Sequence, residues 1–316
     1  MTLVKRLAPW VLKFTLTGLA IWYLLKKVDV GAAWEAGRDV ASWALVAAVL
    51  LQVVQVAICA VRWQMVLRAI GSHLPYRQAV ALFSMGIFFG QVLPGAVGGD
   101  AVRIWQTCRA GLSLTAAFNS VTLERIATVF GLVLLVVMTQ PLLASRLGDG
   151  ATLWVFPALT VASLAGIGVL MQLDRMPEAL RRWRIVRGFA NLAGDTRRLF
   201  WRRRPAFSVL VVVIVGHINL ALVVWCLALG LDAPASLLDC LVLVPPVVLI
   251  STLPISIAGW GAREVAMVTL FGLVGVNAAQ ATAMSVLFGL ASMVIALPGG
   301  GFWLLSTDRA VRQLEP

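Results

Sequence analysis

Long runs of apolar residues, separated by short polar stretches, dominate the chain. A helix needs about 20 consecutive apolar residues to cross the hydrocarbon core of a membrane. Six stretches approach or exceed this length: 8–25, 41–61, 117–138, 151–173, 206–230 and 279–305. The pattern predicts an all-α polytopic membrane protein with about six full spans, in which residues 1–316 form a single transmembrane domain.

The first apolar stretch is the least regular, because Lys13 interrupts it. Residues 1–33 also have the features of a signal peptide, since Lys5 and Arg6 precede the apolar residues. The interruption and the stop at Lys26 and Lys27 favour an anchor that is retained in the membrane.

Two further apolar regions, roughly 79–105 and 237–277, are broken by proline and glycine. Proline blocks helix continuation and glycine permits turns. Non-helical backbone at membrane depth occurs only where protein or a wet cavity surrounds it. We therefore expect two re-entrant helical hairpins or broken helices. Their turn residues are Pro94, Gly95, Gly98 and Gly99 in the first region, and Pro254, Gly259 and Gly261 in the second.

The distribution of positive charge predicts the topology. Ten arginines lie between Arg175 and Arg204, so the loop 174–205 is expected on the cytoplasmic side. Counting six spans from this loop places both termini in the cytoplasm of a bacterial-type inner membrane. The two hairpins would then enter from opposite sides, which is the arrangement expected of an inverted-topology transporter.

The Arg-rich loop allows a simpler interpretation than a binding site. Arginines at 181, 182, 184 and 187, together with Trp183 and Phe189, favour an interfacial amphipathic helix that binds anionic headgroups. The net charge of +12 is often typical of nucleic-acid binding, but this cluster lies between two spans. We therefore expect lipid contacts and no nucleic acid.

Composition excludes most soluble enzymes. The chain is 60% hydrophobic and 13% charged, whereas soluble domains have roughly 25% charged residues. The four cysteines show no CxxC spacing, and there is no HExxH or GxSxG motif. We expect no metal, no cofactor and no enzymatic activity.

Charged residues beside the broken segments need a physical reason, because a charge at the bilayer centre costs about 2.5–3.5 kcal/mol. The candidates for binding a lipid headgroup are Asp100, Arg103, Glu124, Arg125, Arg263 and Glu264. Asp100 and Arg103 have the i, i+3 spacing of an ion pair. Arg263 and Glu264 are adjacent on a helix, so we expect them to diverge toward other partners.

Two interpretations of these charges stay open. In one, arginines line a wet cavity and hold a lipid phosphate, which their planar guanidinium groups suit. In the other, the charges lie at interface depth and brace the bundle. His217, Gln52 and Gln55 fall inside spans, where we favour contacts between helices over a functional role.

Four motifs resemble those of one family: RW at 62–63, QVLPGAVGGDAVR at 91–103, LERI at 123–126 and LPISIAGWGARE at 253–264. The chain resembles the flippase-like transmembrane domain of lysylphosphatidylglycerol synthases and its stand-alone relatives. The resemblance spans nearly the whole chain. It implies movement of a lipid or a lipid-linked headgroup between leaflets.

The resemblance also implies which partners to expect. They are membrane lipids, namely an anionic or aminoacylated phospholipid, a glycolipid or a hopanoid, together with a separate lipid-synthesising enzyme. In the synthases a soluble domain makes the aminoacyl lipid, and the sequence ending at Pro316 does not include one, so we do not expect synthase activity.

The resulting hypothesis is a lipid translocator with Arg103 and Arg263 holding the headgroup phosphate between the two hairpins. Asp100, Glu124 and Glu264 would balance charge or select a cationic headgroup. One alternative is an integral-membrane lipid-modifying transferase that uses Asp100 and Glu124. Another is a non-catalytic membrane partner of a lipid-modifying enzyme.

Overall fold

A computed structural model describes residues 40–92, 97–147, 184–201, 203–252 and 261–306, with a few isolated positions outside these ranges. The described ranges are helical and contain no strand. The predicted span 8–25 and nearly all of 151–173 lie outside the described residues. So do four of the predicted turn residues, Pro94, Gly95, Pro254 and Gly259.

Four helices have apolar stretches long enough to cross a membrane: α3 (Ser42–Ala69), α6 (Leu114–Leu147), α10 (Arg203–Gly230) and α13 (Ala278–Leu305). A helix of 28 residues, such as α3, is about 42 Å long, which exceeds a hydrocarbon core of roughly 30 Å. Large apolar side chains on their outer faces, such as Val46, Leu50 and Val215, are exposed. The protein is therefore a polytopic helical membrane protein, and these four helices confirm four of the six predicted spans.

The two broken apolar regions form pairs of short helices. The first pair is α4 (Tyr76–Val92) and α5 (Val97–Arg109), and the second is α11 (Leu237–Thr252) and α12 (Ala262–Gly272). The longest of the four has 17 residues, or about 26 Å, which is shorter than the hydrocarbon core. The predicted hairpins are therefore confirmed as helical pairs, while their turning back inside the membrane stays a prediction.

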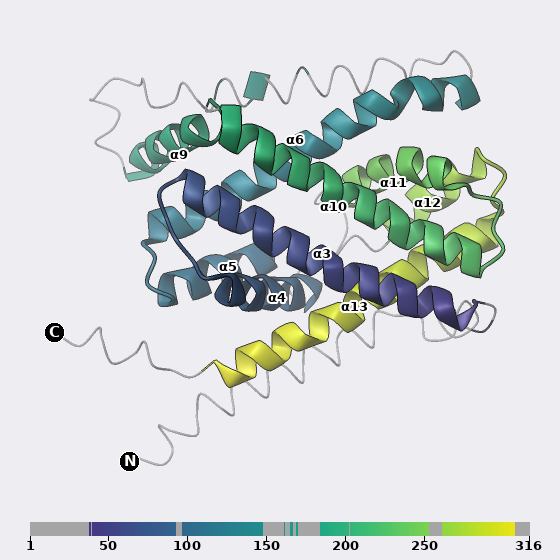
Figure 1. The fold of residues 1–316 in the computed structure, drawn as a ribbon, viewed down its shortest axis with the longest axis horizontal. Helices are drawn as coiled ribbons and strands as arrows, with labels where there is room; N and C mark the ends of the chain where they lie inside the picture. The colour runs from purple at the N-terminus through teal and green to yellow at the C-terminus, as the bar shows by residue number, and fades with distance from the viewer. Residues whose placement is uncertain are drawn as a thin grey trace.

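The eight helices of the bundle follow the same order twice. A long helix, two short helices and a second long helix occur as α3 to α6 and again as α10 to α13. The first helices of the two series pack antiparallel, because Gly230 at the end of α10 meets Ala44 near the start of α3, and Gly216 approaches Ile58. Figure 1 shows hairpin α4–α5 beside the C-terminal end of α3 and hairpin α11–α12 beside that of α10. The repeated order and the antiparallel first helices are those expected of an inverted repeat, which stays a prediction.

The first helix of each hairpin packs on the last long helix of the other repeat, in addition to the contacts within its own repeat. Helix α4 contacts α13, and in the same way α11 contacts α6. The two repeats are thereby interlocked, so the hairpins are held by the bundle from both sides.

The Arg-rich region contains helix α9 (Arg184–Phe200), which begins within the predicted amphipathic segment. Its described residues bury Leu192, Ala193 and Leu199, while Arg198 is exposed. Asn119 of α6 donates a hydrogen bond of 2.7 Å to Asp195 of α9. Residues 184–200 are thus no open loop but a helix that is docked on the bundle.

Glycine lets backbones approach closely where α13 crosses α4. A methyl group on Gly299 would overlap the carbonyl group of Ser84, and one on Gly300 would lie 3.0 Å from the ring of Phe88. A methyl group on Gly301 would meet nothing within 4 Å. The glycine run therefore packs closely through its first two residues.

We expect Gly299→Ala to lower the thermal unfolding midpoint of the detergent-purified protein. The added methyl group must displace backbone, and overpacking of this kind costs about 1–3 kcal/mol. Gly301→Ala is the matched control and should be neutral or slightly stabilising, because alanine is favoured over glycine inside helices by about 0.5–1 kcal/mol. Equal effects of the two substitutions would contradict the contact.

Candidate functional site

Glu124 of α6 is the centre of a buried ion-pair network beside the first hairpin. Arg62 of α3 donates through Nε to Glu124 Oε1 at 2.8 Å, and its Nη2 donates to the same oxygen. Arg103 of α5 donates to Glu124 Oε2 at 3.1 Å. All three side chains are at most 5% exposed. The carboxylate therefore joins three helices of the first repeat.

Asp100 extends the network to the surface. Its carboxylate lies 3.6 Å from Arg103, which confirms the predicted i, i+3 ion pair, and it accepts hydrogen bonds of 2.7 and 3.1 Å from Arg125. Arg125 is about half exposed. Glu124 and Arg125 thus face different partners although they are neighbours in the chain, and the network of three arginines and two carboxylates carries one net positive charge.

Aromatic rings complete the environment of Arg103. Its guanidinium carbon lies 4.3 Å from the ring centroid of Trp63 and 4.5 Å from that of Phe83. Such cation–π contacts are strongest when the groups are desolvated. Gly86 makes room for them, since a methyl group there would overlap the aliphatic part of Arg103.

The predicted span 41–61 stops short of Arg62. Helix α3 continues to Ala69 and buries Arg62 at 4% exposure. The ion pair with Glu124, 62 residues away, offsets the cost of desolvation. The only signal in the sequence was the RW pair that belongs to the family motifs.

The second hairpin holds a smaller polar cluster. Arg263 of α12 donates through Nε to Ser285 Oγ of α13 at 2.9 Å, and Ser285 donates to Glu264 Oε1 at 3.0 Å. Arg263 also pairs directly with Glu264 at 3.1 Å. The expectation that Arg263 and Glu264 diverge was wrong, because Ser285 on the facing helix draws both side chains to one side.

Glu264 is fully engaged within the protein. Its second oxygen accepts a hydrogen bond from the backbone N–H of Gly261, which has φ of +86° and directly precedes α12. A positive φ is adopted readily by glycine alone. Gly261 thereby sets the start of α12, and this start positions Arg263.

The two repeats place an arginine in corresponding positions but give it different partners. Arg103 and Arg263 each lie on the second helix of their hairpin and each bond to the long helix that follows. That helix offers a carboxylate, Glu124, in the first repeat and a hydroxyl, Ser285, in the second. Both arginines are ion-paired at 3.1 Å, Arg103 with Glu124 on that helix and Arg263 with Glu264 on its own helix.

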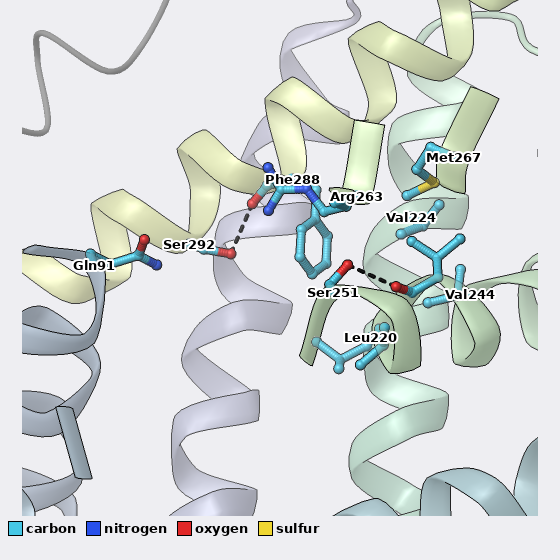
Figure 2. Close-up of a pocket in the computed structure, with 11 residues that line it drawn as sticks. Gln91, Leu220, Val224, Val244, Ser251, Arg263, Met267, Phe288 and Ser292 are labelled. Carbon is cyan, nitrogen blue, oxygen red and sulfur yellow. Dashed lines mark hydrogen bonds between the residues drawn. The ribbon is translucent and has the colours of Figure 1, made fainter. Parts of the chain in front are cut away.

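A pocket of about 240 Å³ lies among helices α10 to α13, next to the end of α4. Its polar lining residues are Gln91 at the end of α4, Ser251 at the end of α11, Arg263, and Ser292 of α13 (Figure 2). The apolar lining comes from α10, α11, α12 and α13. The predicted residues Asp100, Arg103, Glu124, Arg125 and Glu264 do not line it.

Figure 2 shows Phe288 beside Arg263 and Gln91 reaching in from α4. The ring centroid of Phe288 lies 5.5 Å from the Arg263 guanidinium carbon. The hydroxyls of Ser251 and Ser292 donate to the backbone carbonyls of Val247 and Phe288, at 2.7 and 2.9 Å, and Ser292 Oγ also accepts a hydrogen bond of 3.1 Å from Gln52. The pocket therefore combines one cation, neutral polar groups and an apolar wall.

Polar residues inside the spans join helices, as predicted for the two glutamines. Gln52 of α3 donates to Ser292 of α13 at 3.1 Å, and Asn219 of α10 donates to Gln55 of α3 at 2.9 Å. His217 is buried at 5% exposure, and neither ring nitrogen has a hydrogen-bond partner among the described residues. His217 nevertheless lies between helices, as predicted, because it is buried on α10 with the backbone of Thr128 of α6 beside its ring.

A comparison with known protein families identifies the family of the chain. The family model described as "Lysylphosphatidylglycerol synthase TM region" matches residues 10–300. The chain belongs to this family. A search of curated proteins finds no match. Membership of the lysylphosphatidylglycerol synthase TM family, together with the four long apolar helices, makes the chain a multi-pass membrane protein with a lipid-related function.

We expect Glu124→Gln to destabilise the protein strongly. Removing the carboxylate leaves Arg62 and Arg103 buried without their counter-ion, and breaking a buried pair costs about 3–5 kcal/mol. The measurement is the thermal unfolding midpoint in detergent.

Arg125→Gln is the matched control, because it removes an exposed ion pair worth about 0–1 kcal/mol. A Glu124→Gln protein that is as stable as the Arg125→Gln protein would contradict the central role of this carboxylate.

Proposed function

We propose that the protein moves a phospholipid or a lipid-linked headgroup between the leaflets of a bacterial inner membrane. The observation that supports this most is the pocket beside the second hairpin, which combines Arg263 with an apolar wall. Interrupted segments from two inverted repeats typically mark the binding site of a transporter. The lipid-related family is in keeping with a lipid as the cargo.

Arg263 is the residue that holds the headgroup phosphate in this proposal. A guanidinium group suits phosphate oxygens, and the surrounding apolar residues strengthen the interaction by excluding water. Arg103 is no longer proposed to hold the phosphate. It lies against Glu124 and two aromatic rings and does not line the pocket.

The geometry favours a translocator over a transferase. Asp100 and Glu124 were the carboxylates offered for acid–base chemistry, and each is ion-paired with two arginines. A general base has to reach its substrate within about 2.6–3.2 Å. Carboxylates that brace the bundle in this way do not line the pocket.

Arg263→Gln should slow lipid translocation roughly ten- to hundred-fold, because a hydrogen bond to a charged group contributes about 1.5–3 kcal/mol. The measurement uses proteoliposomes with fluorescent phosphatidylglycerol and dithionite, which bleaches the outer leaflet only. Wild-type protein should expose the inner half of the label to bleaching.

Arg198→Gln is the control for this experiment, since it removes an arginine that is exposed on α9. Full translocation by a well-folded Arg263→Gln protein would contradict the proposed role of the pocket.

The proposed orientation has α9 in the cytoplasm and the turn between α10 and α11 outside. A membrane-impermeant maleimide applied to intact cells should label Asp232→Cys, in that turn, and spare Arg198→Cys, on α9. Both are introduced after the four native cysteines are replaced. The opposite labelling pattern would show that the proposed orientation is reversed. It would leave the described fold unchanged.

A further inference from the structure

His217 is one of the two histidines of the chain, and it lies buried in the middle of α10 at 5% exposure. The backbone of Thr128 lies beside its ring, yet neither ring nitrogen has a hydrogen-bond partner in the described ranges. Buried polar side chains in proteins are nearly always paired. An imidazole that is buried without a hydrogen bond inside a membrane span therefore needs a functional explanation.

The ring lies next to the buried ion pair of the first repeat. A methyl group on Gly216, the residue before His217, would lie 3.9 Å from Nη1 of Arg62. Thr128, whose backbone adjoins the ring, donates its hydroxyl to the carboxylate of Glu124 at 3.4 Å. His217 is therefore adjacent to both members of the pair, to Arg62 on α3 and to Glu124 on α6.

The same face of α10 continues to the pocket. Leu220 and Val224 line the pocket, and their spacing from His217 places all three residues on one side of the helix. The rise along the helix from His217 to Leu220 is about 4.5 Å. His217 therefore lies between the charged centre of the first repeat and the pocket of the second.

Positive charge prevails around His217. Helix α3 contributes Arg62, and α6 contributes Glu124, whose second oxygen pairs with Arg103, so these three buried groups carry one net positive charge. Helix α13 has no ionisable side chain. Further ionisable side chains on the neighbouring helices include Cys59 and Arg68 of α3, Arg125 of α6, Asp195, Arg197 and Arg198 of α9, Asp239 and Cys240 of α11, and Arg263 and Glu264 of α12.

This environment holds the ring uncharged in the described conformation. A proton on the ring would place a second positive charge near Arg62, with no hydrogen bond to either ring nitrogen. Burying an unpaired charge is costly. A conformation that separates His217 from Arg62, or that admits water to the ring, binds the proton better. Protonation therefore shifts the protein away from the described conformation, because a ligand favours the state that binds it more tightly.

Arg62 connects this event to the pocket along one face of α3. It donates to the sulfur of Cys59 at 3.5 Å, and Gln55 donates to the same sulfur at 3.7 Å. Gln52, which lies on the same face, donates at 3.1 Å to Ser292 in the pocket wall. A displacement of Arg62 by a nearby positive charge therefore acts on a row of polar side chains that reaches the pocket.

We propose that His217 is a proton-binding site that controls translocation. Its unprotonated ring nitrogen takes up a proton from water, the charged ring repels Arg62, and the helices around the pocket leave the described conformation. Acid should therefore speed up translocation, since alternating access requires the protein to leave this conformation. The effect on translocation rests on the proposed function, whereas proton binding and the change in conformation do not.

The first test compares backbone hydrogen exchange of the purified full-length protein with that of His217→Gln at the same pH. At pH 5.5, below the ordinary histidine pKa of about 6.5, peptides of α3 around Arg62 should exchange at least about threefold faster in the unsubstituted protein. At pH 7.5 the two proteins should exchange alike. His73→Gln is the matched control, because His73 is the other histidine and is exposed, and it should behave like the unsubstituted protein.

The second test measures translocation of a short-chain fluorescent phosphatidylglycerol in proteoliposomes at both pH values. Serum albumin extracts the label from the outer leaflet, and protein-free liposomes give the background rate. The unsubstituted protein and His73→Gln should translocate the lipid at least about threefold faster at pH 5.5 than at pH 7.5. His217→Gln should translocate it at a rate that does not depend on pH.

The outcomes separate the two proposals. Equal hydrogen exchange of the unsubstituted protein and His217→Gln at pH 5.5 would overturn the proton site, and translocation with the same pH dependence in both would do so without affecting the proposed function. A change in exchange that depends on His217, without translocation at either pH, would overturn the proposed function and support the proton site. His217→Asn is the second neutral variant, to be used if His217→Gln does not fold.

Discussion

One buried carboxylate determines how the first repeat is assembled. Glu124 brings Arg62 of α3 and Arg103 of α5 to a single point on α6, far from water. Each arginine would be costly in an apolar bundle without this partner, and the carboxylate would be equally costly without them. The three charges are therefore stable only together, and their helices are fixed relative to one another.

The second repeat uses the same frame for a different purpose. Its arginine rests against a serine, a neighbouring glutamate and a phenylalanine, and it lines a pocket. Arg263 is thus ion-paired within its own helix and also lines a pocket, whereas Arg103 lies among the buried charges beside the first hairpin.

Much of this architecture could be predicted from the sequence, because hydrophobic length and Pro/Gly interruptions are local signals. Four spans, both hairpins and the Asp100–Arg103 pair were predicted in this way. The partners of Arg62 and Arg263 could not be predicted, since Glu124 and Ser285 are distant in the chain. The pocket could not be predicted from the sequence either, because its apolar lining has the same composition as surfaces that face lipid.

The glycine contacts have a consequence for how such a frame diversifies. Gly99 approaches the backbone of Gly86 and Gly90, and Gly299 approaches that of Ser84. No exchange of a neighbouring side chain can relieve a clash between backbones, so these positions tolerate little variation. Apart from Gln91, which follows Gly90, the pocket-lining side chains lie at other positions. Side chains of the pocket can therefore vary in evolution while the spacing of the helices stays constant.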